Sequence, residues 1–146
     1  MENETKIDEL LCVAVEAGLD GLDFVSPLGY DVLREGYNGI GPEFLPPELR
    51  AKVTEFLSLF EPAALVHDLR NHFGDGSKEG FLAANDEFRR NCLKLADMRY
   101  GMFSLRRYRA RAVAQVLYDF VSADSFGWRA WLEAKERHAA KNVSRE

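Results

Sequence analysis

Two adjacent ionisable residues, His67 and Asp68, lie in the run EPAALVHDLRNHFG, whose other members have the apolar spacing of a buried helix face. Burying such groups costs free energy unless they are paired, so the two side chains need partners or a chemical role. A histidine can act as a general base toward water, and an aspartate can bind a cation or accept backbone N–H groups. Which role applies depends on the elements that position them.

The elements around the pair are predicted to be helices. A double proline at 46–47 opens one helix, which should end near Pro62, where a second helix restarts and runs to a glycine break at 74–76. Ser77 can cap a third helix. Because the break is short, the second and third helices should pack as an antiparallel pair. The third helix has an apolar stripe with one polar member, in the order Phe81, Asn85, Phe88, Cys92 and Leu95.

Residues at similar distances from the turn of an antiparallel pair face each other, so we expect the imidazole of His67 to meet the amide of Asn85. One interpretation is structural: the hydrogen bond fixes the register of the two helices. In the other, His67 is a general base aimed at a water, and its second ring nitrogen is held by Asn85 or by the neighbouring Asp86. A neutral amide orients the ring but gives the imidazolium little charge stabilisation.

Asp68, on the other flank of its helix, can face the glycine-rich segment EGYNGIGPEF. Gly39 and Gly41 allow backbone carbonyls there to turn toward one point. A carboxylate with several carbonyl oxygens suits a hard cation such as calcium. The same spacing suits a loop clamp in which the carboxylate accepts backbone N–H groups, and on spacing alone we favour the clamp.

The order of these segments, YNGIG followed by a helix with HD and then a second antiparallel helix, resembles the phospholipase A2 core. The segments YNGIGPEFLPPELR, FEPAALVHDLRN and FLAANDEFRRNC also resemble a group of small bacterial and prophage-encoded proteins related to that core. The resemblance covers about residues 36–100, which would form a helix-pair core.

The resemblance implies a role for each candidate residue. His67 would be the general base that activates water against a lipid ester. The chain departs from the family because Asn85 replaces the orienting aspartate, or that aspartate is displaced to Asp86, and because the usual disulfides and secretory signal are missing. The implied calcium ligands are Asp68 and the backbone carbonyls of Tyr37, Gly39 and Gly41.

Two functions therefore stay open. One is a calcium-dependent lipid ester hydrolase of phospholipase A2 type. The other is a non-catalytic prophage or virion protein, structural or assembly-related, that retains the fold with a degenerate site. The missing signal and Asn85 favour the second function.

The rest of the chain predicts a mainly α, single domain over residues 1–146. A helix at Thr5–Ala17 should be stopped by Gly18, and the turn-rich stretch 21–44 has room for a small β-hairpin in which DFV and YDVL flank SPLG. Residues 141–146 are expected to be a frayed tail. A helix after Ser104 would face inward through Leu105, Tyr108, Ala112, Val116 and Phe120, and a last short helix would hold Trp128, Trp131 and Leu132.

Composition limits the classes of function. Hydrophobic residues make up 47% of the 146, enough for a core, and no run is long and apolar enough to span a membrane. The N-terminus is acidic where a secretory signal would be basic, which predicts a cytoplasmic location or release with phage particles. Cys12 and Cys92 read as packed thiols, and neither a disulfide framework nor a zinc site is expected.

The charge is unevenly distributed. Eight positive residues stand against one acid between Arg89 and Arg111, a segment charge of +7 in a chain of net charge −5. Such a segment can mark a lipid or other anionic surface, although more often it is a helix face neutralised by acidic neighbours. The acidic net charge argues against nucleic-acid binding.

Overall fold

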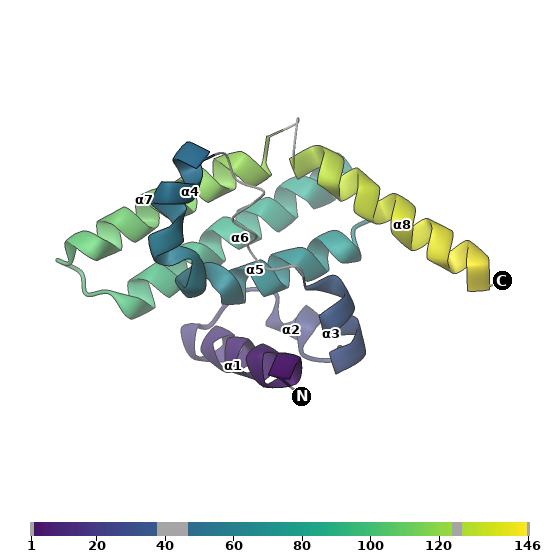
Figure 1. Ribbon diagram of the computed structural model, residues 1–146, viewed down its shortest axis with the longest axis horizontal. Coiled ribbons are helices and arrows are strands. Elements are labelled where there is room, and N and C mark those ends of the chain that lie inside the picture. The colour runs from purple at the N-terminus through teal and green to yellow at the C-terminus, as the bar shows by residue number, and fades with distance from the viewer. Residues whose placement is uncertain (1, 38–46, 124–126, 146) are drawn as a thin grey trace.

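The computed structural model describes residues 2–37, 47–123 and 127–145 (Figure 1). Within these ranges there is no strand, and the mainly α fold class is confirmed. In chain order the elements are α1 (Glu2–Ala17), α2 (Leu22–Val25), α3 (Tyr30–Gly36), α4 (Pro47–Val53), the 3₁₀ turn η2 (Thr54–Phe56), α5 (Leu57–His72), α6 (Lys78–Arg99), α7 (Leu105–Val121) and α8 (Arg129–Arg145). None of the helices in these ranges is long and apolar enough to cross a membrane.

The helix α6 lies at the centre of the fold, packed against α5 on one side and α7 on the other (Figure 1). The predicted antiparallel pair of α5 and α6 is therefore confirmed. The shorter helices α2 and α3 lie with α1 against α5, and α8 packs across the far end of α5. Three apolar clusters fill the spaces between these helices, and the largest lies among α1, α5, α6 and α7.

The start and inner face of α6 follow the sequence prediction. The Ser77 hydroxyl accepts a hydrogen bond from the Gly80 N–H at 3.0 Å, which caps the helix. All five residues of the expected stripe, Asn85 included, are buried. Gly18, with φ of 65°, follows α1 as expected, in a conformation that residues with a side chain rarely adopt.

The predicted β-hairpin is wrong. Its two segments form the short helices α2 and α3 instead, and Val25 and Leu33 from them are buried against α1 and α5. Glycine and proline signals mark chain reversals, but they do not specify whether the segments between them are strands or helices.

The predicted helix boundary at Pro62 is also wrong. The break lies earlier, at η2, and Pro62 is a buried residue inside α5. Because proline lies close to the start of α5, it removes only one backbone hydrogen bond near the helix end. In η2 the tighter winding places residues three apart on one side, so that Val53 and Phe56 both enter the core.

The expected inward face of α7 requires correction. Leu105, Tyr108 and Ala112 are exposed, and Val116 and Phe120 are half-buried. The face that meets the core consists of Ala110, Val113, Ala114 and Leu117. The last helix, α8, is longer than expected at 17 residues, and it continues to Arg145 through most of the segment predicted as a frayed tail.

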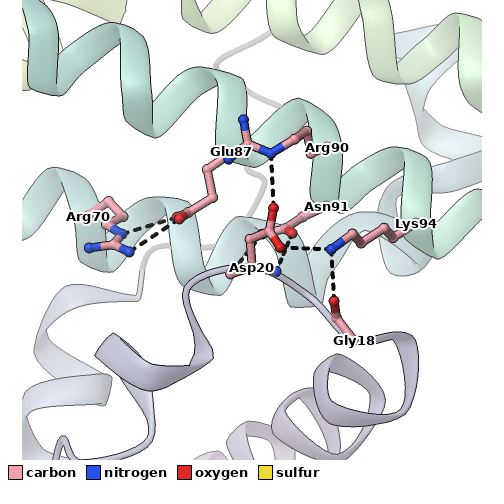
Figure 2. A network of polar contacts seen from close by, with 7 residues as sticks. All are labelled: Gly18, Asp20, Arg70, Glu87, Arg90, Asn91 and Lys94. Atoms are coloured by element: carbon pink, nitrogen blue, oxygen red, sulfur yellow. Dashed lines mark hydrogen bonds and ion pairs between the residues drawn. The ribbon is translucent and has the colours of Figure 1, made fainter.

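A polar network ties the connection between α1 and α2 to the side of α6 (Figure 2). The Asn91 side chain, fully buried, accepts a hydrogen bond from the Asp20 N–H at 2.7 Å and donates one to the Asp20 carbonyl at 3.0 Å. The Asp20 carboxylate accepts from Lys94 at 2.7 Å and from Arg90 at 2.9 Å. These two cations, Lys94 first, lower the pKa of Asp20. One turn of α6 thus satisfies both the backbone and the side chain of Asp20.

We predict that Asn91→Ala lowers the free energy of unfolding by about 2–4 kcal/mol, because it leaves the backbone N–H and carbonyl of Asp20 without their partners. Urea denaturation measures the change. Arg90→Ala is the matched control, since it removes only an exposed ion pair and should cost less than about 1 kcal/mol. Equal losses in the two variants would contradict the prediction.

Candidate functional site

The imidazole of His67 on α5 meets the amide of Asn85 on α6, as the spacing around the glycine turn predicts. The distance from Nε2 of His67 to Oδ1 of Asn85 is 2.8 Å. Both side chains are buried, with 8% of His67 and 1% of Asn85 exposed. The imidazole also lies against the ring of Phe88, with 4.7 Å between ring centroids. The expected contact is therefore confirmed.

The hydrogen bonds of Asn85 indicate which nitrogen of His67 carries the proton. Nδ2 of Asn85 donates to the Val121 carbonyl at 3.4 Å, so Oδ1 is the atom that faces the imidazole. An amide oxygen can only accept, and Nε2 of His67 is consequently the donor. In the neutral ring Nδ1 is then the nitrogen with a free lone pair, the atom that a general base would use.

Burial lowers the pKa of His67 below the ordinary value of 6.5. The hydrogen bond to Asn85 and the negative charge of Glu87 act in the opposite direction, but they do not offset the loss of solvation. The imidazole is therefore neutral at physiological pH.

Asp86 does not take part in this contact. It is exposed, and its Oδ1 accepts a hydrogen bond from the Tyr118 hydroxyl at 3.0 Å. The carboxylate raises the pKa of Tyr118. Of the two residues expected to orient His67, the structure brings only Asn85 to the ring.

Asp68 lies on α5, the helix against which α3 packs. It is half-buried, and its charge, after burial and the charge of Glu61, raises the pKa of Tyr37. The charge of Asp68 therefore acts on Tyr37, one of the residues in the calcium prediction. Gly39 and Gly41, the other two expected ligands, lie outside the described residues.

The acidic, histidine and cysteine side chains of the described residues do not by themselves form a calcium site. Calcium takes six to eight oxygen ligands, of which several are usually carboxylates. In the part of the chain that the structure describes, no group of three or more histidine, cysteine, aspartate or glutamate side chains could hold a metal ion. These residues do not make a calcium site by themselves, and calcium binding stays a prediction.

A small cavity of about 160 Å³ adjoins Tyr37 and is also lined by Lys6, Ile7 and Arg34. Lys6 pairs with Glu61 at 3.4 Å, and Arg34 pairs with Glu4 at 3.5 Å. Both cations at the cavity are therefore already neutralised by acids of the chain. The cavity opens on the Tyr37 side of α5, and His67 does not line it.

Neither cysteine forms a nucleophilic site. Cys92 is buried, as expected, and burial raises the pKa of its thiol, which keeps it protonated and inert. Cys12 is exposed, which corrects the expectation that both thiols are packed.

Sequence reasoning missed two contacts near the His67–Asn85 pair. The Val121 carbonyl is the second partner of Asn85, and no sequence signal marks a backbone carbonyl at a helix end. Arg70 forms two hydrogen bonds to Glu87, at 3.1 and 3.2 Å, across the same two helices. Arg70 lies five residues before Asp75 and Glu87 twelve residues after it, so their distances from the glycine turn did not indicate this second link.

Comparison with known proteins finds no match to any family model, any curated protein or any solved structure.

We predict that His67 makes the protein less stable as the pH falls. The folded-state pKa is lowered, so below 6.5 the unfolded chain binds a proton that the folded chain does not, and stability is lost as the pH falls toward the folded pKa. The free energy of unfolding should therefore decrease more between about pH 7.5 and about pH 5 in the wild type than in His67→Gln.

In that comparison the introduced glutamine offers an amide N–H to Asn85 but does not titrate in this range. The other two histidines are present in both proteins, so their contribution cancels in the difference. Identical pH dependence of the two unfolding free energies would contradict a lowered pKa at His67.

Proposed function

We propose that the protein is a non-catalytic helical protein of the structural or assembly class, in which His67 and Asn85 hold the central helices in register. One observation supports this most: His67 is enclosed, with Nε2 bonded to Asn85, the ring against Phe88 and 8% of the residue exposed. The prophage resemblance would place such a protein in the cytoplasm or in a released particle, as part of the same proposal.

The contacts of Asn85 support a structural role because they join three helices. Its oxygen accepts from His67 on α5, and its nitrogen donates to the carbonyl of Val121, the last residue of α7. A buried amide with both ends satisfied fixes the positions of its partners, since any shift leaves a polar group without a hydrogen bond. Asn85 thus sets the register of α6 against both neighbours.

A catalytic role for His67 would require a different kind of residue at position 85. A general base becomes an imidazolium during turnover, and a carboxylate partner would stabilise that charge. Asn85 cannot do so, because it is neutral, and the burial that lowers the pKa of His67 also disfavours the charged ring.

Asn85→Asp separates the two roles by the sign of its effect. If the role is structural, the variant loses free energy of unfolding at neutral pH, because an aspartate side chain cannot donate to Val121 and brings a charge into the core. It should also show no hydrolysis of ester-linked phospholipids.

His67→Ala should lower the free energy of unfolding by about 2–4 kcal/mol, because it leaves the Asn85 oxygen unpaired and a space beside Phe88.

Urea denaturation and a fatty-acid release assay measure these outcomes, with Asp86→Asn as the control variant. Asp86 lies next in sequence but is exposed, so its substitution should cost less than about 1 kcal/mol. Measurable hydrolysis by the wild type that rises in Asn85→Asp and disappears in His67→Ala would overturn the structural proposal.

A lipid ester hydrolase is the second candidate, favoured by the tautomer of His67. The bond from Nε2 to Asn85 leaves Nδ1 as the basic atom, and the lowered pKa keeps it unprotonated at neutral pH. The charge of Asp68, the next residue, acts on Tyr37, which lies within the glycine-rich segment EGYNGIGPEF. Asp68 and carbonyls of Tyr37, Gly39 and Gly41 would hold a calcium ion, which when bound supplies electrostatic stabilisation of an oxyanion.

Isothermal titration calorimetry of calcium into the wild type and into Asp68→Asn tests this candidate. A hydrolase requires binding with a dissociation constant in the micromolar to millimolar range that the substitution abolishes. Under the structural proposal neither protein binds calcium. Asp31→Asn is the control, because Asp31 is an exposed carboxylate on α3 that pairs with Arg34.

A further inference from the structure

The turn that joins α6 and α7 carries apolar side chains into solvent. Phe103 is 90% exposed, Leu105 79%, Met102 67% and Tyr108 60%. Met98, in the last turns of α6, is also exposed. We call residues 98–109 the α6–α7 tip. In Figure 1 the connection between these helices lies at one end of the molecule, away from α8.

These side chains contrast with the rest of α7. Sequence periodicity assigned Leu105 and Tyr108 to the core. The residues of α7 that are buried in the core lie on a different face of the helix, and they are Ala110, Val113, Ala114 and Leu117. Packing inside the monomer therefore gives no reason for large apolar residues at the tip. Contiguous exposed apolar residues of this kind usually mark an interaction surface.

The tip is also positively charged. Residues 98–109 include four arginines and no acid, and Arg111 follows two residues later. Arg107 and Arg111 pair with Asp97, and Arg109 pairs with Glu55. Among the described residues no ion pair is recorded for Arg99, whose guanidinium lies over the Tyr100 ring at 5.5 Å, or for Arg106. Two cations beside the exposed apolar side chains are thus left for an anionic partner.

We propose that the α6–α7 tip docks on an anionic lipid bilayer, with Phe103, Leu105 and Met102 entering the interface and Arg99 and Arg106 meeting lipid phosphates. A bilayer interface accepts aromatic and aliphatic side chains from a protruding turn, while arginine side chains extend to the headgroups. This surface is separate from His67: Met98 lies 13 residues beyond Asn85 on α6, about 20 Å along the helix. The inference does not rest on the proposed role of His67.

The size of the tip favours a bilayer over a protein partner. A stable protein interface takes about 20–30 residues from each side. The tip is the end of a single helical hairpin and exposes far fewer residues than that. A bilayer requires no matching groove, so a narrow convex end is sufficient. Single-stranded nucleic acid could also contact arginine and aromatic groups, but the net charge of −5 opposes it.

Sedimentation with lipid vesicles tests the proposal. We expect the wild type to bind vesicles of phosphatidylcholine and phosphatidylglycerol in equal parts, to bind pure phosphatidylcholine vesicles at least about tenfold more weakly, and to lose binding as salt is raised. Phe103→Ser with Leu105→Ser should weaken binding about tenfold or more, and so should Arg99→Gln with Arg106→Gln.

Two control variants match these changes elsewhere on the surface. Val15→Ser removes an exposed apolar side chain from α1, and Arg129→Gln removes an exposed arginine from α8. Both should bind like the wild type. The four substituted tip residues, Arg99, Phe103, Leu105 and Arg106, are exposed, so circular dichroism should show that the variants fold. His67→Ala, if it folds, should also keep vesicle binding, because its defect lies elsewhere.

Failure of the wild type to sediment with anionic vesicles would overturn the proposal, as would wild-type binding by both tip variants. A concentration-dependent dimer in analytical ultracentrifugation that is lost in the Phe103→Ser and Leu105→Ser double variant would overturn it in favour of a second copy. Displacement from vesicles by a single-stranded oligonucleotide through the same arginines would overturn it in favour of nucleic acid.

Discussion

The burial of α6 between α5 and α7 is the constraint on which the rest of the structure depends. A helix covered on both sides can keep polar residues on its inner faces only if each finds a partner. Asn85 is satisfied by His67 and the Val121 carbonyl, and Asn91 by the backbone of Asp20. These two amides, less than two turns apart, fix α6 against α5, α7 and the connection that follows α1.

The partly exposed flank of α6 repeats this pattern with charges. Arg70 reaches across from α5 to Glu87, and its guanidinium also lies over the Phe24 ring at 4.3 Å. Lys94 and Arg90 reach the Asp20 carboxylate. Such pairs are individually weak in solvent, but each bridges different elements and adds direction to apolar packing that is otherwise non-directional. The polar contacts of α6 thus restrict the arrangements in which the neighbouring helices can pack against it.

The sequence predicted the site better than its surroundings, for a physical reason. A short glycine turn leaves two helices few ways to pack, so the facing of His67 and Asn85 followed from their distances to that turn. The face of α7 could not be found in this way, because two of its four buried residues, Ala110 and Ala114, are small and carry little hydrophobic signal. Similarly, nothing local distinguishes one turn of helix at Leu22–Val25 from a short strand; its burial against α1 and α5 decides.

The mistaken face of α7 is itself informative. Large apolar residues at a helical period normally belong to a core, yet Leu105 and Tyr108 are exposed while Ala110 and Ala114 are buried. The larger side chains of Leu105 and Tyr108 therefore lie outside the core formed by the described residues. At the other end of α6, the enclosed imidazole of His67 has its hydrogen bond inside the fold. The region that sequence chemistry first singled out is thus inward-facing, and the surface that we propose for binding another molecule lies at the α6–α7 tip.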